Sequence, residues 1–470
     1  MQERRPETAR SQARQSRRGR RAAAAGAAAP APRDQAARAR RNLDKVDHIV
    51  VLMLENRSFD HMLGYLHLEA ERDEVDGLAS DMANTFAGET YPVFHLDSTV
   101  FAADPRHDAQ SVALQIGPRR DMSGFVESFA AVLPSDPGKI MGYYNAGDLP
   151  TYDLLAREYS LCQRWFASFP GPTWVNRLYA LAGHSEGETE NRLVPIYDLP
   201  TFPRALDAAG VSWKWYPHDV STLRLVDGHY RIGHAEHFAY VASFYQDAAD
   251  GTLPSVSWID PNFQDLGGTA TANDDHPPTD VQHAQALIWR VYRALLEGPL
   301  WEKTLLLVTY DEHGGFFDHV PPPLVPSQGV DGPAFVWYGV RVPALVVSPW
   351  VERGAVSSVV FDHTSILSTI LHRFCEAPDG SIPFFSRRAA QANHVGWLLT
   401  QARPRTATTR RATTRATRRV EQHLTALHVS PRAVAARAVA AATVPPTDLQ
   451  QQISAAKQYL RAQGHPEGQP

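Results

Sequence analysis

The sequence predicts an α/β fold with a doubly wound, mostly parallel sheet that carries helices on both faces. Two observations support this prediction. Short, uninterrupted apolar runs recur along the chain and end in polar residues, and segments with a helical spacing of apolar residues lie between them. Strands that alternate with helices are typical of parallel sheets, in which both faces of each strand are covered.

The predicted strands are three apolar runs, at residues 49–54, 304–310 and 342–347. Runs that are so short and so continuously apolar are typical of strands buried on both faces. Two of them end directly in acidic residues, and the third ends at Ser348-Pro349. We therefore expect all three to be core strands of a parallel sheet.

Helical spacing predicts four helices between and after these strands, at residues 152–159, 176–183, 281–296 and 365–374. Two further segments, 60–150 and 185–280, are rich in Pro, Gly, Asp and aromatic residues and lack clear periodicity. Such composition favours long insertions that fold over the active-site edge of the sheet.

Composition divides the chain into three parts. Residues 1–42 are biased toward Arg, Ala and Pro and are expected to be disordered. A single folded domain is expected over residues 43–386. An Arg-rich linker and a peripheral helical tail should follow at 387–470, with modest helices at 420–442 and 447–462.

The net charge of −5 conceals a strong segregation of charge along the chain. Residues 1–41 carry a net charge of +9 and residues 402–419 one of +7, which leaves about −21 on the remainder. An acidic body favours cation binding and disfavours binding to nucleic acid. The basic flanks could contact anionic lipid or nucleic acid, but we favour the interpretation that they keep the tails solvated.

The sequence gives few indications of compartment. No stretch of about 18 apolar residues is present that could span a membrane. The run from Arg20 to Pro30 is a poor export signal because Ala and Gly form a weak apolar segment, so a cytoplasmic location is slightly favoured. Cys162 and Cys375 are expected to be two small buried residues, although one disulfide remains an alternative.

Acidic pairs follow two of the predicted strands. Glu55-Asn56 comes directly after the first strand and Asp311-Glu312 directly after the second. In open α/β sheets ligands bind at the carboxyl ends of the strands, where these pairs should meet. Carboxylates brought so close together repel one another unless a hard divalent cation lies among them. The alternative for either pair alone is that it caps the start of a helix.

A rigid Pro/Gly segment leads into the predicted helix that contains Thr173. The hydroxyl could simply be a helix N-cap. Alternatively, a hydroxyl at a helix N-terminus faces amide donors that favour an anion, and a nearby metal would stabilise its alkoxide. Asn176 and Arg177 would then reach the oxygens of a phosphoryl group.

Three histidines lie in polar loops rather than on apolar faces, namely His107, His276 and His319. Most of the 20 histidines of this chain must have no chemical role, so any single one is weak evidence. Their acidic neighbours and their positions near predicted strand ends favour a chemical role for these three histidines.

Taken together, four long motifs resemble the bacterial phosphoesterase family, which contains phosphatidylcholine-type phospholipases C and a related acid phosphatase. They occur in the order expected for the family, and the likeness runs from about Val46 to about Phe374. The motifs lie at residues 55–61, 171–179, 273–277 and 310–316.

The resemblance implies an alkaline-phosphatase-like α/β core with one divalent metal ion, which could be Ca, Mg, Mn or Zn. It implies that Glu55, Asn56, Asp311 and Glu312 bind this metal beside a hydroxyl nucleophile that is also a ligand. In this sequence the nucleophile falls on Thr173.

The same resemblance places His107, His276 and His319 around the phosphoryl group of the substrate. Asp275 is the candidate partner that fixes the orientation of one of these rings. We expect either His319 or His107 to protonate the departing oxygen.

The sequence therefore predicts a metal-dependent hydrolase of phosphoric esters, with phospholipase C-type cleavage of a phosphodiester through a phosphothreonine. An acid phosphatase that acts on phosphomonoesters is a close alternative, and a non-catalytic anion- or lipid-binding protein is the alternative from another class. The expected partner is a phospholipid or its head-group ester, with transient contact to a membrane surface. The family resemblance keeps export open.

Overall fold

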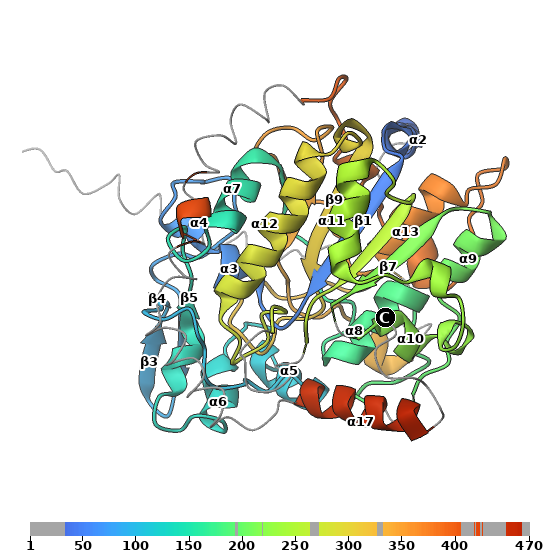
Figure 1. Ribbon diagram of the computed structural model, residues 1–470. Helices are drawn as coiled ribbons and strands as arrows, with labels where there is room; N and C mark the ends of the chain where they lie inside the picture. The colour runs from blue at the N-terminus through green and yellow to red at the C-terminus, as the bar shows by residue number, and fades with distance from the viewer. Residues whose placement is uncertain are drawn as a thin grey trace, which may run out of the picture.

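A seven-stranded sheet lies at the centre of the computed structural model (Figure 1). The structure describes residues 33–192, 196–218, 220–263, 272–326, 332–405, 418, 420–423, 425 and 448–462. The strand order is β11-β6-β10-β9-β1-β8-β7. The strands are β1 (His48–Leu54), β6 (Ser160–Cys162), β7 (Trp213–Pro217), β8 (Val256–Asp260), β9 (Thr304–Tyr310), β10 (Ala344–Val347) and β11 (Val356–Ser357).

The predicted strands are confirmed, with one difference of direction. β1 and β9 are neighbours and parallel, with Leu54 opposite Tyr310. β10 runs antiparallel to both β9 and β6, whereas the remaining pairings are parallel. The expectation that the third run is a parallel strand was therefore wrong. A parallel neighbour needs a crossover connection, usually a helix, and between β9 and β10 the described residues form only the short 3-10 helix η6 (Pro333–Phe335).

Helices cover both faces of the sheet, which confirms the doubly wound arrangement. On β7, the Trp215 ring stacks on Trp258 and contacts Phe202 of α9 (Phe202–Ala208), while the next residue, Tyr216, contacts Phe244 of α11 (Val241–Asp250). Successive side chains of a strand point to opposite faces, so α9 and α11 lie on opposite sides. One layer consists of α7 (Pro150–Glu158), α11 (Val241–Asp250) and α12 (Val281–Glu297), and the other of α8 (Thr173–Ala182), α9 (Phe202–Ala208) and α13 (Thr364–Phe374) (Figure 1).

The two aromatic-rich segments differ from each other. Residues 60–150 form short elements at the lower left of Figure 1, as expected for an insertion. Residues 185–280, in contrast, contribute β7 and β8 to the central sheet, so the prediction of one long insertion there was wrong. These five-residue strands contain Lys214, Ser257 and Asp260, which hide the apolar pattern.

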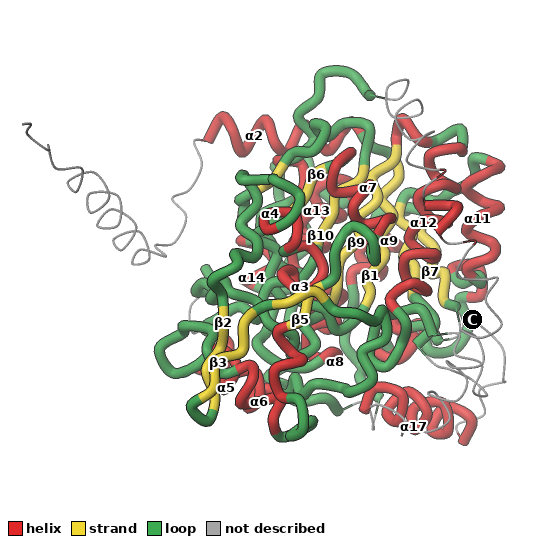
Figure 2. Tube along the Cα trace, turned by 90° about the vertical axis from the view of Figure 1, so that its left-hand side faces the viewer, coloured by secondary structure: helices red, strands yellow, loops and turns green. Residues whose placement is uncertain are grey.

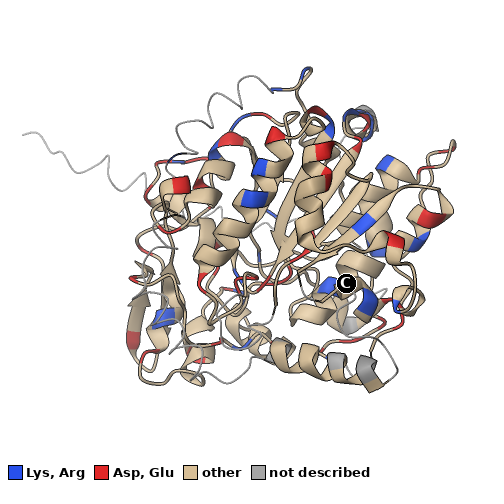
Figure 3. Ribbon diagram, in the orientation of Figure 1, with Lys and Arg blue, Asp and Glu red and all other residues tan. Residues whose placement is uncertain are grey.

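Most of the remaining helices and strands are short. On the outer helices, α12 carries charged residues of both signs, whereas the charged residues of α11 are acidic (Figure 3). The short elements are α3 (Phe59–Leu63), α4 (Tyr65–Leu68), β2 (Ala83–Phe86), β3 (Glu89–Pro92), β4 (Phe94–His95), α5 (Ala109–Ile116), α6 (Phe125–Ala130), β5 (Gly142–Tyr143), α10 (Thr222–Val226) and α14 (Arg387–Gln391), with 3-10 helices η1 (Leu43–Lys45), η2 (Pro137–Met141), η3 (Gly228–Tyr230), η4 (Ala235–His237), η5 (Trp301–Lys303) and η7 (Val395–Trp397).

The segment before β1 is more ordered than its composition predicts. Residues 33–42 form α2, in which Ala39 is buried and the Asn42 amide donates to Gly396 O at 3.1 Å. Its Ala and Arg residues are strong helix formers, and packing against η7 supplies the apolar contact that periodicity did not reveal. The rest of the predicted disordered segment, residues 1–32, lies outside the described residues.

The packed body also continues past the expected domain boundary at residue 386. Arg388 is buried and donates to Asp362 at 3.0 Å, and Arg405 donates to Glu158 O at 2.6 Å. α17 (Asp448–Ala462) matches the helix expected at 447–462 and lies at the base of the molecule in both views (Figures 1 and 2). The helix expected at 420–442 falls mostly outside the described residues.

Cys162 is buried and Cys375 is half-buried, and both are free thiols, so the alternative of a disulfide is not realised. Among the described residues, no helix combines the length and the apolar character needed to cross a membrane.

Candidate functional site

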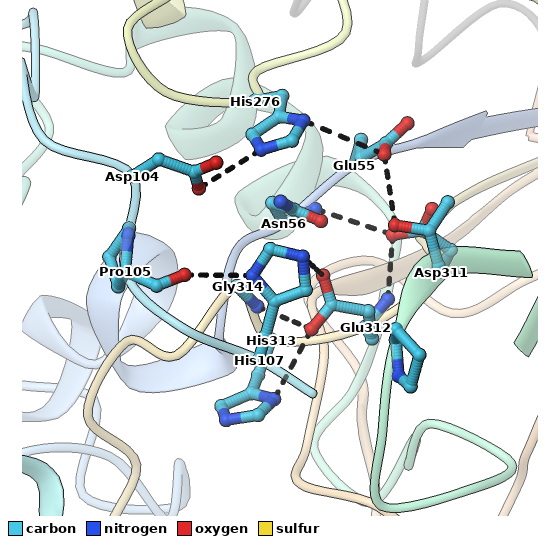
Figure 4. A network of polar contacts seen from close by, with 12 residues as sticks. Glu55, Asn56, Asp104, Pro105, His107, His276, Asp311, Glu312, His313 and Gly314 are labelled. Carbon is cyan, nitrogen blue, oxygen red and sulfur yellow. Dashed lines mark hydrogen bonds and ion pairs between the residues drawn. The ribbon is translucent and has the colours of Figure 1, made fainter. Parts of the chain in front are cut away.

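The acidic pairs that follow β1 and β9 converge at one edge of the sheet (Figure 4). Because β1 and β9 are paired in parallel, Glu55-Asn56 and Asp311-Glu312 leave the sheet side by side. The backbone N–H of Asn56 donates to Asp311 Oδ1 at 3.3 Å. All four side chains are fully buried. The structure therefore brings together the residues that the sequence proposed as metal ligands.

The first turn of α8 completes this cluster. The Thr173 hydroxyl donates to Glu55 Oε1 at 3.1 Å. One helical turn later, Arg177 donates from Nε to Asp311 Oδ2 at 2.9 Å and from Nη2 to Glu55 Oε2 at 3.2 Å. The Arg177 guanidinium thus fixes the positions of two carboxylates of the cluster. It therefore contacts acidic residues of the protein, whereas the sequence predicted a contact with a phosphoryl group.

Asn176 also forms other contacts than the expected one with a phosphoryl group. Its amide oxygen accepts from Phe169 N at 2.8 Å, and its amide nitrogen contacts the carbonyl oxygens of Phe169, Gly171 and Pro172 at 3.0–3.1 Å. The side chain therefore stabilises the Pro/Gly loop that leads into Thr173 instead of pointing into the cluster.

The backbone at the cluster has a conformation that few residues adopt. Asn56 has φ of 60°, in the left-handed region that Asn tolerates better than most residues. Gly314, with φ of 63°, approaches it so closely that an added Cβ would lie 2.3 Å from Asn56 O. The glycine after Asp311-Glu312-His313 is thus needed for the two strand ends to meet.

Several buried polar atoms of the cluster have no hydrogen-bond partner among the described residues. They are both side-chain amide atoms of Asn56 and the Oε1 atom of Glu312. Burial, followed by the neighbouring Asp311 carboxylate, raises the pKa of Glu55 well above its usual range, and burial raises the pKa of Asp311 to about 6. Unpartnered buried oxygens and mutually repelling carboxylates are costly without a cation, and an all-oxygen donor set fits a hard divalent ion.

A second group, Asp60, Asp318 and His319, also offers ligand atoms within 4.8 Å of one another. Here, however, the buried Arg341 guanidinium lies between the acids, 3.0 Å from Asp60 Oδ1 and 2.9 Å from Asp318 Oδ1. His319 contacts Asp60 at 2.6 Å and Asp76 at 3.1 Å, so both ring nitrogens are engaged. The positive charges of Arg341 and His319 thus already offset the negative charge of the acidic residues in this group. His319 belongs to this group and not to the cluster around Thr173.

Two other predicted histidines do face the cluster (Figure 4). His107 donates from Nδ1 to Pro105 O at 2.8 Å and places Nε2 4.0 Å from Glu312 Oε1. His276 places Nδ1 3.7 Å from Glu55 Oε1. Burial opposes the charged form of His107, but the carboxylates of Glu312 and Asp104 raise the pKa of its imidazole to about 9.

Asp104, rather than Asp275, orients the His276 ring. Its carboxylate lies 3.1 Å from His276 Nε2, whereas the Asp275 carboxylate accepts from the Tyr310 hydroxyl at 2.5 Å. Sequence reasoning missed Asp104, although it precedes His107 in the same polar loop. Its position three residues before a candidate catalytic histidine could have identified Asp104 as a site residue.

Comparisons with known proteins identify the family to which the chain belongs. The model of the Phosphoesterase family matches residues 46–375. Non-specific phospholipase C6 of Arabidopsis thaliana is 35% identical over 352 residues, which cover 69% of this chain and 67% of the relative. Phospholipase C B of Mycobacterium tuberculosis is 31% identical over 402 residues, which cover 71% and 74%.

Similarity to solved structures is lower. A protein in the alkaline phosphatase superfamily from Vibrio parahaemolyticus matches with a TM-score of 0.32 and 11% identity, over 60% of this chain and 71% of that one. The assignment therefore rests on the family match and on the sequence relatives. On these grounds the chain belongs to the Phosphoesterase family and is a phosphoric ester hydrolase.

Proposed function

We propose that this hydrolase is a phospholipase C that cleaves a phosphodiester of a phospholipid, with Thr173 as the nucleophile. The observation that carries the proposal is the Thr173 hydroxyl, which is buried and donates to Glu55 at 3.1 Å inside the carboxylate cluster. The names of the plant and mycobacterial relatives support the substrate class. Because phospholipids lie in membranes, this activity requires transient contact with a lipid surface.

Phosphoesterases of this kind typically use divalent metal ions. The residues that would hold such an ion in this chain are Glu55, Asn56, Thr173, Asp311 and Glu312. When bound, it would lower the pKa of a coordinated hydroxyl and offset negative charge on the phosphoryl oxygens.

The chain's own residues supply the first half of the reaction. Thr173 transfers its proton to Glu55 Oε1, and its oxygen attacks phosphorus. The bond from phosphorus to the diacylglycerol oxygen breaks, and His107 gives its Nε2 proton to that oxygen. This produces diacylglycerol and a phosphothreonine that still carries the head group. The N-terminus of α8, where Thr173 is the first residue, favours the negative charge of the phosphoryl group.

Hydrolysis of the phosphothreonine completes the cycle. His107 accepts a proton from the attacking water, and Glu55 returns its proton to the Thr173 oxygen as the phosphorylated head group leaves. We assign the acid–base role to His107 because its Nε2 faces the cluster, 4.0 Å from Glu312 Oε1, while its Nδ1 donates to Pro105 O. His276 would bind a phosphoryl oxygen from the opposite side.

The proposal is tested with two substitutions at one position. Thr173→Ala should lower kcat by at least about 10³-fold relative to wild type. Thr173→Ser retains a hydroxyl and should keep a measurable fraction of the activity. Rapid quenching of the Thr173→Ser variant and the wild type should trap a phosphorylated residue 173, detectable by mass spectrometry. Full activity of Thr173→Ala would overturn the proposal.

Substrate preference separates the two closest alternatives. The kcat/KM for phosphatidylcholine vesicles and for p-nitrophenyl phosphorylcholine should exceed that for p-nitrophenyl phosphate. A clear preference for the phosphomonoester would indicate an acid phosphatase instead.

A further inference from the structure

Gln115 lies between two parts of the site that the chain brings together from distant positions. It is on α5, in the helix that follows the candidate acid His107, and it is 1% exposed. Its amide contacts both the loop that carries His107 and the residue that follows the proposed ligand Glu312. No motif in the sequence singled it out.

The hydrogen bonds of Gln115 fix the orientation of its amide. The amide nitrogen donates to Arg106 O at 2.7 Å and to Ser128 Oγ at 3.1 Å. A carbonyl oxygen can only accept, so the amide nitrogen must face Arg106. The amide oxygen is thereby left facing His313 Nε2, from which it accepts at 2.8 Å.

This contact in turn orients the ring of His313. Because Nε2 donates to Gln115, the other ring nitrogen, Nδ1, faces Glu312 and lies 3.5 Å from its Oε2. Gly314 N donates to the same Glu312 oxygen at 2.7 Å. These contacts leave Glu312 Oε1 directed toward His107 Nε2, at 4.0 Å.

Gly315 allows the two parts to approach each other. It has φ of 75°, and an added Cβ would lie 2.7 Å from Arg106 O and 3.3 Å from the Gln115 amide nitrogen. The chain after Glu312 therefore packs directly against the loop that carries His107, and one amide spans the contact.

We infer that Gln115 is a positioning residue that sets the placement of His107 relative to Glu312. The inference rests on the proposed function, in which His107 protonates the leaving oxygen and Glu312 holds the metal. Through Arg106 the amide places the loop of the acid, and through His313 it places the ligand. Partners of this kind typically change metal affinity or activity by about 10–100-fold when they are removed.

Two variants separate the two contacts. Gln115→Ala removes both of them. Gln115→Glu keeps an acceptor for His313 but cannot donate to Arg106 O. Ser128→Ala is the matched control, because it removes the third hydrogen bond of the same amide and leaves both contacts intact.

The first readout is the dependence of rate on the leaving group. For both Gln115 variants, kcat on phosphatidylcholine should fall by about 10–100-fold, because its leaving alkoxide must be protonated. On a p-nitrophenyl diester the decrease in kcat should be several-fold smaller, because its leaving group needs little protonation. The second readout is calorimetric titration of the metal-free protein with Mn²⁺. Gln115→Ala should bind about 10-fold more weakly or worse, whereas Gln115→Glu and Ser128→Ala should stay near wild type.

The outcomes are distinguishable from those for the proposed function. If both diesters lose activity equally and Mn²⁺ affinity is unchanged, Gln115 is merely structural and the inference fails, while an inactive Thr173→Ala still supports the proposed function. If Gln115→Ala does not fold, Gln115→Glu alone decides, through its leaving-group dependence. Wild-type behaviour of both variants also overturns the inference.

Discussion

Replacing His319 with glutamine should destabilise the fold strongly at pH 6 and much less at pH 9.5. In the native protein, Asp60 and Asp76 outweigh the effect of burial and raise the pKa of His319 to about 9, against 6.5 for an unperturbed histidine. A folded pKa above the unfolded value contributes stability that is fully present below about pH 6.5 and is lost as the pH rises through about 9. At 1.36 kcal/mol per unit, the difference corresponds to at most about 3 kcal/mol.

The assay is urea unfolding followed by far-ultraviolet circular dichroism, at pH 6.0, 7.5 and 9.5, for wild type and His319→Gln. The difference in the free energy of unfolding between the two should shrink by about 2–3 kcal/mol across this range. A difference that does not change with pH would refute the reasoning.

His372→Gln is a useful control for this experiment. Burial lowers the pKa of His372, although Glu376 opposes the effect. The stability difference between wild type and this variant should therefore change with pH in the opposite sense.

Three further predictions concern the candidate site. Gly314→Ala should cost at least about 2 kcal/mol of stability in urea unfolding and most of the activity, since a Cβ would meet Asn56 O at 2.3 Å in a left-handed conformation; near-native stability would contradict this. Arg177→Lys should lower kcat by about 10–100-fold and weaken Mn²⁺ binding, because an ammonium cannot hold both the Glu55 and Asp311 carboxylates; unchanged affinity in calorimetric titration would count against it. His107→Ala should lower kcat by about 10²–10⁴-fold on phosphatidylcholine but less on a p-nitrophenyl diester, and equal losses in the two steady-state assays would exclude it as the acid.

The elements that could be predicted from the amino-acid sequence are those with strong local signals. The apolar runs of β1 and β9 are buried along nearly their whole length, and polar residues follow them at once, so the apolar pattern alone locates the ligand pairs. β7 and β8 lack such a pattern, because they contain polar residues. These residues can be buried in the sheet since residues distant in the sequence form hydrogen bonds with them. Asp260, for example, accepts hydrogen bonds from Trp215 and Thr222.

The roles of individual site residues were harder to predict for the same reason. His319 and His107 both lie in polar loops next to acidic residues, and only the tertiary structure places one beside the acids that bind Arg341 and the other against Glu312. Arg177 and Asn176 follow the nucleophile in sequence, but the geometry of α8 turns one toward the carboxylates and the other toward its own loop. Side-chain direction depends on packing that periodicity does not encode.

The pairing of β1 with β9 has a consequence for how the protein is made. Asn56 and Asp311 are 255 positions apart, yet they are joined by a hydrogen bond at the sheet edge. Under the proposed assignment, a ribosome must therefore synthesise the chain as far as Glu312 before all the ligands exist. The complete set of ligands therefore forms only after β9 has been synthesised and paired with β1, and depletion of the ion during expression should lower the yield of native enzyme as well as its turnover.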